Sequence, residues 1–89
     1  MLEQELKVAN RLGLHARAAA RLVQLLSGFR SQATLTGRGR EVNAKSIMGV
    51  LLLAAAPGAT LVLRVEGDDE GEALAACAAL FERRFDEDD

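Results

Sequence analysis

The residue types best suited to chemistry in this sequence gather around a single histidine. His15 follows an alternating apolar stretch and precedes a helical pattern, so we expect it at or beside the N-cap of a helix. The first NH groups of a helix lack partners inside it, and the helix dipole makes this end attractive to anions. Arg17, in the first turn, can place guanidinium donors on phosphoryl oxygens. These residues alone allow two interpretations: a phosphoryl acceptor, or a surface histidine that only caps the helix.

Other kinds of site lack the residues that they need. One histidine and one cysteine cannot supply a metal site of several His or Cys ligands, and the sequence has no Ser/His/acid or Cys/His signature. Residues 37–40 lack the further glycine of a dinucleotide fingerprint and are expected to form a hairpin turn. Base stacking on a sheet needs aromatic strand residues, but Phe29, Phe81 and Phe85 lie outside the expected strands. A protein that binds nucleic acid is therefore disfavoured.

The composition predicts one small domain with an aliphatic core. Of 89 residues, 49% are hydrophobic and only 3% aromatic, which suffices for one core over residues 1–89. The lone Cys77 cannot form an internal disulfide and is expected in the core, and no leader segment is evident. The longest apolar run, residues 50–57, is far shorter than the roughly 20 residues of a membrane span. We therefore expect a cytoplasmic protein without membrane insertion.

The hydrophobic pattern predicts seven elements in the order β-α-β-β-α-β-α. Strands are expected at 2–10, 32–36, 40–43 and 60–66, and helices at 16–27, 47–54 and from Asp69 to about Phe85. Expected helix boundaries are Gly28 as a left-handed C-cap, Ser46 as an N-cap, and a capping box of Asp69 and Glu72. Each element has one apolar side, which predicts an α+β open-faced β-sandwich: a four-stranded antiparallel sheet covered on one face by three helices.

Charge is distributed unevenly along the chain. Residues 1–65 carry a net charge of +6 and residues 66–89 a net charge of −8. The basic part could meet an anionic ligand or an acidic partner surface, although charge runs often only solvate a face. The acidic tail, residues 86–89, is expected to fray.

Two segments resemble the signatures of the HPr family, the histidine phosphocarriers of the phosphoenolpyruvate-dependent phosphotransferase system. They are Asn10-x-x-Gly13-Leu14-His15-Ala16-Arg17 and Val42-Asn43-Ala44-Lys45-Ser46-Ile47-Met48-Gly49-Val50. The resemblance implies that His15 takes a phosphoryl group from enzyme I on Nδ1 and passes it to IIA domains, with Arg17 stabilising the group. It also implies that Ser46 is a regulatory site for HPr kinase/phosphorylase. Such a protein is a carrier rather than an enzyme, and it needs no metal or other cofactor.

The resemblance also implies a docking surface for these partners. It would consist of Ile47, Met48 and Leu51, with Arg21 and Lys45 providing positive charge. Packing against the core is the alternative explanation for the apolar members of this set, because a short helix must bury one side.

Two features of the sequence depart from the usual HPr pattern. Ala18 stands where the family usually has proline, which bears on the stiffness of the loop entering the helix. The ending around Phe85 is similar to the nitrogen-regulatory NPr branch, whereas the segment around Ser46 favours a carbohydrate or carbon-control role. We expect a monomeric HPr-type carrier and keep two alternatives: an NPr-type carrier, and a non-catalytic interaction module.

Overall fold

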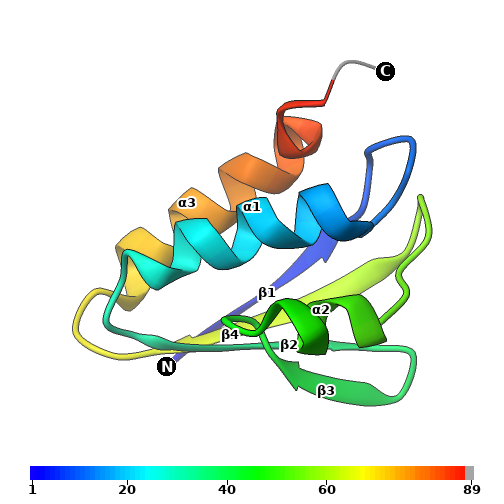
Figure 1. Cartoon of the computed structure of the whole chain (residues 1–89). Coiled ribbons are helices and arrows are strands. Elements are labelled where there is room, and N and C mark those ends of the chain that lie inside the picture. Colours follow the sequence, from blue (N-terminus) through cyan, green and yellow to red (C-terminus); the bar gives the residue numbers. More distant parts are fainter. Residues whose placement is uncertain (88–89) are drawn as a thin grey trace.

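A computed structural model of the chain describes residues 1–87, and its central feature is one antiparallel sheet (Figure 1). The sheet has the strand order β1-β4-β2-β3, so β4 and β2 are internal and β1 and β3 form the edges. The strands are β1 (Leu2–Lys7), β2 (Gln32–Gly37), β3 (Arg40–Asn43) and β4 (Thr60–Glu66). The helices are α1 (Ala16–Ser27), α2 (Ile47–Leu52) and α3 (Glu70–Glu82), followed by the short turn η1 (Arg84–Asp86).

The three helices lie on one face of the sheet, with α1 and α3 side by side and α2 next to α1 and β3 (Figure 1). Between the layers lies an almost wholly aliphatic core to which every strand contributes. Its fully buried members include Leu22, Leu26, Leu35, Val50, Leu61, Leu63, Val65, Cys77 and Phe85. The prediction of an open-faced sandwich is therefore confirmed, because each element buries only its apolar side.

The hydrophobic pattern and the turn residues predicted β4 and the β2–β3 hairpin correctly. Leu61, Leu63 and Val65 alternate with more exposed residues along β4, as period-two patterning requires. The hairpin turns at Arg38 and Gly39, whose φ angles are +55° and +76°. Two positive φ angles are typical of the tight turn whose twist matches that of the flanking strands.

Gly28 and Asp69 flank their helices as predicted, but the expected left-handed conformation of Gly28 and the expected capping box of Asp69 are wrong. Gly28 has a right-handed φ of −78°, because its NH donates to the α1 carbonyl groups and closes the helix with a tight last turn. Asp69 precedes α3 but makes no side-chain cap; its carboxylate instead accepts hydrogen bonds from the amides of Arg30 and Ser31 and from the Ser31 hydroxyl. That tertiary contact replaces the capping box.

Other boundaries differ by a few residues. β1 ends at Lys7, and α2 ends at Leu52 instead of continuing to Ala54, which has a φ of +47°. Phe85 lies in η1 beyond α3 with a φ of +57°, although its side chain is fully buried as expected. Among residues 1–87, no helix is long and apolar enough to cross a membrane.

Candidate functional site

The loop that carries His15 connects β1 to α1, and backbone hydrogen bonds join it to the segment that follows α2. Leu14 donates its NH to the carbonyl oxygen of Ala55 at 3.0 Å, and Val8 donates to Ala59 at 2.9 Å. Gly13 has a φ of +71°, and a Cβ atom there would lie 2.5 Å from the Ala55 carbonyl oxygen. Only glycine allows this approach, so Gly13 sets the path of the chain just before His15.

His15 is the N-cap residue of α1, as the sequence predicted. Its backbone is extended (φ −84°, ψ −176°), and its carbonyl oxygen accepts from Ala19 at 2.9 Å. The ring also caps the helix, because Nδ1 accepts the backbone NH of Arg17 at 3.3 Å. Since Nδ1 accepts a hydrogen bond, it carries a lone pair in this arrangement. The side chain remains 29% exposed, enough for a partner to reach the ring.

The other ring nitrogen contacts a residue from the far end of the chain. Nε2 of His15 lies 2.5 Å from Oε2 of Glu87, while Oε1 of Glu87 accepts from Nδ2 of Asn10 at 3.0 Å. Asn10 is fully buried and also donates to the Gly13 carbonyl oxygen at 2.7 Å. Asn10 therefore braces both the loop and the carboxylate.

Electrostatics keep the Glu87 carboxylate ionised. Burial opposes ionisation, but the hydrogen bonds from Asn10 and His15 outweigh it, together with the positive charge of Arg21, and lower the pKa of Glu87 below its usual value. From the sequence, Glu87 was expected in a frayed tail. Its contact with His15 was missed because nothing within the acidic run distinguishes Glu87 and the contact spans 72 positions. Asp88 and Asp89 lie outside the described residues.

The three basic residues singled out from the sequence have different surroundings. Arg17 is exposed in the first turn of α1. Arg21 donates from Nη1 to the carbonyl oxygen of Phe85, so it anchors η1 to α1. Lys45 donates from Nζ to the carbonyl oxygen of Phe29 at 2.7 Å. Arg17 thus lies beside His15, whereas Arg21 and Lys45 both hold main-chain carbonyl groups.

Ser46 is the N-cap of α2, as predicted. Its Oγ accepts the NH of Gly49 at 3.1 Å, and its carbonyl oxygen accepts from Val50 at 2.9 Å. The residue is partly exposed. Ser46 therefore has a structural role as the cap of α2 and is not fully buried.

The apolar side chains of α2 divide between the core and the surface. Ile47 and Met48 are 43% and 71% exposed, whereas Val50 is fully buried. Leu51 is partly buried against the core, so core packing accounts for much of its side chain. Two further exposed apolar residues went unnoticed in the sequence: Leu52 on α2 and Leu12 in the His15 loop, 58% and 65% exposed. Single exposed leucines are common on protein surfaces, so their exposure alone assigns them no role.

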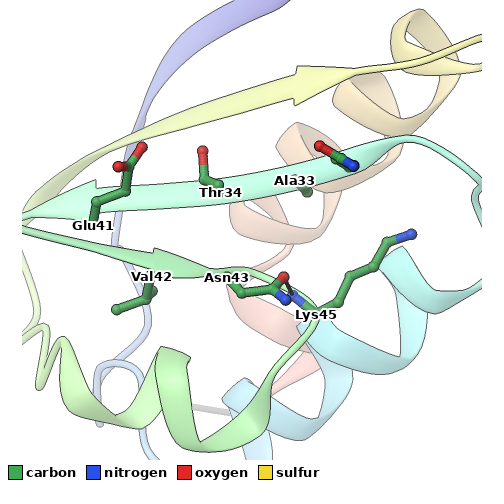
Figure 2. Close-up of a pocket in the computed structure, with 7 residues that line it drawn as sticks. Ala33, Thr34, Glu41, Val42, Asn43 and Lys45 are labelled. Carbon is green, nitrogen blue, oxygen red and sulfur yellow. Dashed lines mark hydrogen bonds between the residues drawn. The ribbon is translucent and has the colours of Figure 1, made fainter.

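Two remaining features are separate from this site. Cys77 is buried in the core, and burial raises the pKa of its thiol to about 12, so it is inert. A hollow of about 480 Å³ lies over β2 and β3, lined in part by Thr34, Glu41 and Lys45 (Figure 2). Neither His15 nor Arg17 lines it, so this hollow is separate from the candidate site.

Comparison with known proteins supports the fold and the motifs. Residues 2–83 match the family model described as PTS HPr component phosphorylation site. The phosphocarrier protein HPr of Xylella fastidiosa strain Temecula1 is 60% identical over 88 residues, which cover 99% of each chain. The phosphocarrier protein NPr of Escherichia coli K12 is 40% identical over 88 residues, 98% of each chain.

The solved structures agree. HPr-C-His from Thermoanaerobacter tengcongensis is 44% identical, covers 99% of both chains and superposes with a TM-score of 0.94. Sequence, length and topology therefore all correspond over the whole chain, and the His15 loop falls within the matched region. This chain belongs to the HPr family of phosphocarrier proteins of the phosphotransferase system.

Proposed function

We propose that this protein is a cytoplasmic carrier that accepts a phosphoryl group from enzyme I on Nδ1 of His15 and passes it to IIA domains. The observation that carries the proposal is the placement of His15. It caps α1 within a chain of the HPr family, its side chain is partly exposed, and Nδ1 carries a lone pair beside the helix amides. Arg17 is the residue that binds the phosphoryl oxygens as charge develops on them.

Phosphoryl transfer needs little covalent machinery from the protein, since positioning and charge stabilisation dominate. The Nδ1 lone pair gives up its hydrogen bond from the Arg17 NH and attacks phosphorus, and the bond between phosphorus and the donor breaks with its electron pair leaving on the donor. The free NH groups at the start of α1 and the Arg17 guanidinium bind the transferred oxygens. In the second transfer, Nδ1 is the leaving group, so the phosphorylated protein needs no nucleotide or metal of its own.

The test is incubation with phosphoenolpyruvate, magnesium and enzyme I. The wild type should gain one acid-labile phosphoryl group, measured by mass spectrometry, and should lose it to a IIA domain. His15→Ala should gain none, because it has no other histidine. Labelling of that variant would contradict the assignment of His15, and an unlabelled wild type would support the interaction-module alternative.

We propose that Ile47, Met48 and Leu51 contribute to the surface on which these partners dock, together with Arg21 and Lys45. The exposure of Ile47 and Met48 supports this surface, and the unbranched Met48 suits several partners. Leu51 contributes less, because it is partly buried. Ser46, at the start of the same helix, is the proposed target of HPr kinase/phosphorylase.

A role in sugar uptake and carbon regulation is favoured over an NPr-type role. The observation behind this choice is the 60% identity to an HPr, compared with 40% to the NPr of Escherichia coli. We propose that the protein acts as a monomer, although an HPr dimer is among the similar solved structures. Sedimentation at micromolar concentration distinguishes the two states.

A further inference from the structure

The chain after α3 turns back toward the start of α1 through an unusual backbone conformation. Arg84, Phe85 and Asp86 have φ angles of +56°, +57° and +59°, a left-handed run that residues with a Cβ atom rarely adopt. Such conformations persist where surrounding contacts determine them, and they often occur at functional sites. Phe85 is fully buried with its ring centroid 4.8 Å from that of Phe81, and Arg21 holds its carbonyl group. This turn delivers Glu87 to His15.

The Glu87 carboxylate is held in one place. Its side chain is only 7% exposed, and its two oxygens have different partners, Asn10 and His15. The buried amide of Asn10 donates to Glu87 and to Gly13 at once, so the carboxylate and the histidine loop share one fixed support. The contact with His15 is thus prearranged within the free protein.

The contacts of the two ring nitrogens define the state of the imidazole. Nδ1 faces the NH of Arg17 and therefore has no proton, while Nε2 faces a carboxylate and therefore has one. This neutral form is the one that can attack phosphorus through Nδ1. When the bond from Nδ1 to phosphorus forms, the ring becomes positively charged, and an adjacent carboxylate stabilises that charge.

We propose that Glu87 is a positioning residue, which holds the Nε2 proton of His15 so that Nδ1 presents its lone pair to the phosphoryl donor. This inference rests on the proposed function of His15. During transfer, the bond from Nδ1 to phosphorus forms, the donor leaves with the electron pair of its own bond to phosphorus, and the Nε2 proton stays on the ring. Donation to the next protein reverses the change at Nδ1, so no proton needs to be exchanged with solvent.

Three variants test separately whether Glu87 holds the Nε2 proton and whether its negative charge stabilises the positively charged ring. Glu87→Met removes both functions with a side chain of similar length. Glu87→Gln keeps an oxygen that can accept the Nε2 hydrogen but has no charge. Asp86→Asn is the matched control, because it removes a neighbouring carboxylate that pairs with Arg83, and asparagine tolerates a positive φ.

The first measurement is ¹⁵N NMR of the ring at a pH where it is neutral, which is unambiguous because the chain has one histidine. The wild type, Asp86→Asn and Glu87→Gln should show a protonated Nε2 whose proton exchanges slowly with water, and an unprotonated Nδ1. In Glu87→Met the Nε2 proton should exchange at least about tenfold faster. Equal exchange in Glu87→Met and Asp86→Asn would overturn the proposal, whether or not the protein accepts a phosphoryl group.

The second measurement is the rate of phosphorylation by enzyme I, with circular dichroism to confirm equal folding. We expect Glu87→Gln to be slower than Asp86→Asn by about tenfold, the effect of one lost charge-assisted hydrogen bond, and Glu87→Met to be slower still. Rates equal to the control in both variants would overturn the catalytic part of the proposal. A wild type that takes up no phosphoryl group would instead refute the proposed function, and the NMR result would still decide whether Glu87 holds the proton.

Discussion

At the scale of single residues, the side chains of the candidate site differ in how firmly their surroundings hold them. The imidazole of His15 is held at both nitrogens, whereas the guanidinium of Arg17 extends from an exposed position in the first turn of α1. An exposed arginine contributes little to packing, and the role proposed for Arg17 is to bind charge that is present only during transfer. The role of Arg17 can therefore be separated from stability.

Replacing Arg17 with alanine should slow phosphoryl transfer and leave folding unchanged. We expect the rate constant to fall by about 10- to 100-fold, or roughly 1.4 to 2.7 kcal/mol of transition-state stabilisation. The control is Arg30→Ala, which removes the same charge from an exposed residue beyond the other end of α1. Quench-flow kinetics with enzyme I gives the comparison, and equal rates for both variants would count against the role of Arg17.

At the scale of elements, the loop before α1 and the start of α3 depend on contacts between distant segments. Gly13 places the His15 loop against Ala55, and Asp69 joins the loop after α1 to the start of α3. Each contact can be tested by its effect on stability.

Gly13→Ala should destabilise the protein far more than Gly39→Ala. Both residues have a positive φ, which costs an alanine about 1 kcal/mol at either position. At Gly39 nothing lies within 4 Å of the added methyl group, whereas at Gly13 the group meets the Ala55 carbonyl oxygen. We expect the free energy of unfolding, measured in urea, to fall by about 1 kcal/mol in Gly39→Ala and by about 2 to 4 kcal/mol in Gly13→Ala. Equal losses would show that the loop is not packed against Ala55.

Asp69 should stabilise the native state, and this stabilisation should be lost at acid pH. The hydrogen bond from the Ser31 hydroxyl, aided by the amide of Arg30, lowers the pKa of Asp69 to about 2 in the folded protein. Since this pKa is below the unfolded value of about 3.9, the contribution is complete above that value and is lost as the pH falls through about 2. The difference in urea midpoint between wild type and Asp69→Asn should therefore shrink below about pH 4. The control is Asp68→Asn, at the exposed residue before Asp69. Its difference in urea midpoint from the wild type should not shrink in this way.

The sequence predicts local structure better than contacts between distant segments. The β2–β3 hairpin and the caps at His15 and Ser46 depend on neighbouring residues, and they were predicted correctly. Asp69 was misassigned because a tertiary partner, Ser31, competes for its carboxylate. Glu87 was missed for the same reason: only the left-handed turn after α3, which no periodicity reveals, brings it to His15.

At the scale of the whole molecule, the fold places the acidic end of the chain beside its basic part. The acidic helix α3 lies beside the basic helix α1 (Figure 1). Beyond α3, the Glu87 carboxylate contacts His15 at the start of α1. Arg17, Ile47 and Met48 remain exposed, which suits a partner surface that is acidic around an apolar centre. Adding negative charge to this surface should therefore weaken docking without altering the fold.

Ser46 provides the place to test that expectation. Phosphorylation would add nearly two negative charges at the N-terminus of α2, where the helix dipole favours them, so the fold should persist. The same charges beside Ile47 and Met48 would raise the cost of desolvating an apolar contact and would repel an acidic partner. Ser46→Asp should imitate part of this effect, since aspartate also caps helices well.

We therefore expect Ser46→Asp to bind enzyme I at least about tenfold more weakly than wild type, measured by titration calorimetry. Ser46→Ala should bind within about twofold of wild type, although losing the cap to Gly49 should cost about 1 kcal/mol of stability. Ser27→Asp is the control for net charge, because Ser27 is exposed at the opposite end of α1 from His15. If Ser46→Asp binds like this control, or if Ser46→Ala is the more impaired variant, Ser46 serves only as a cap and the proposed switch is wrong.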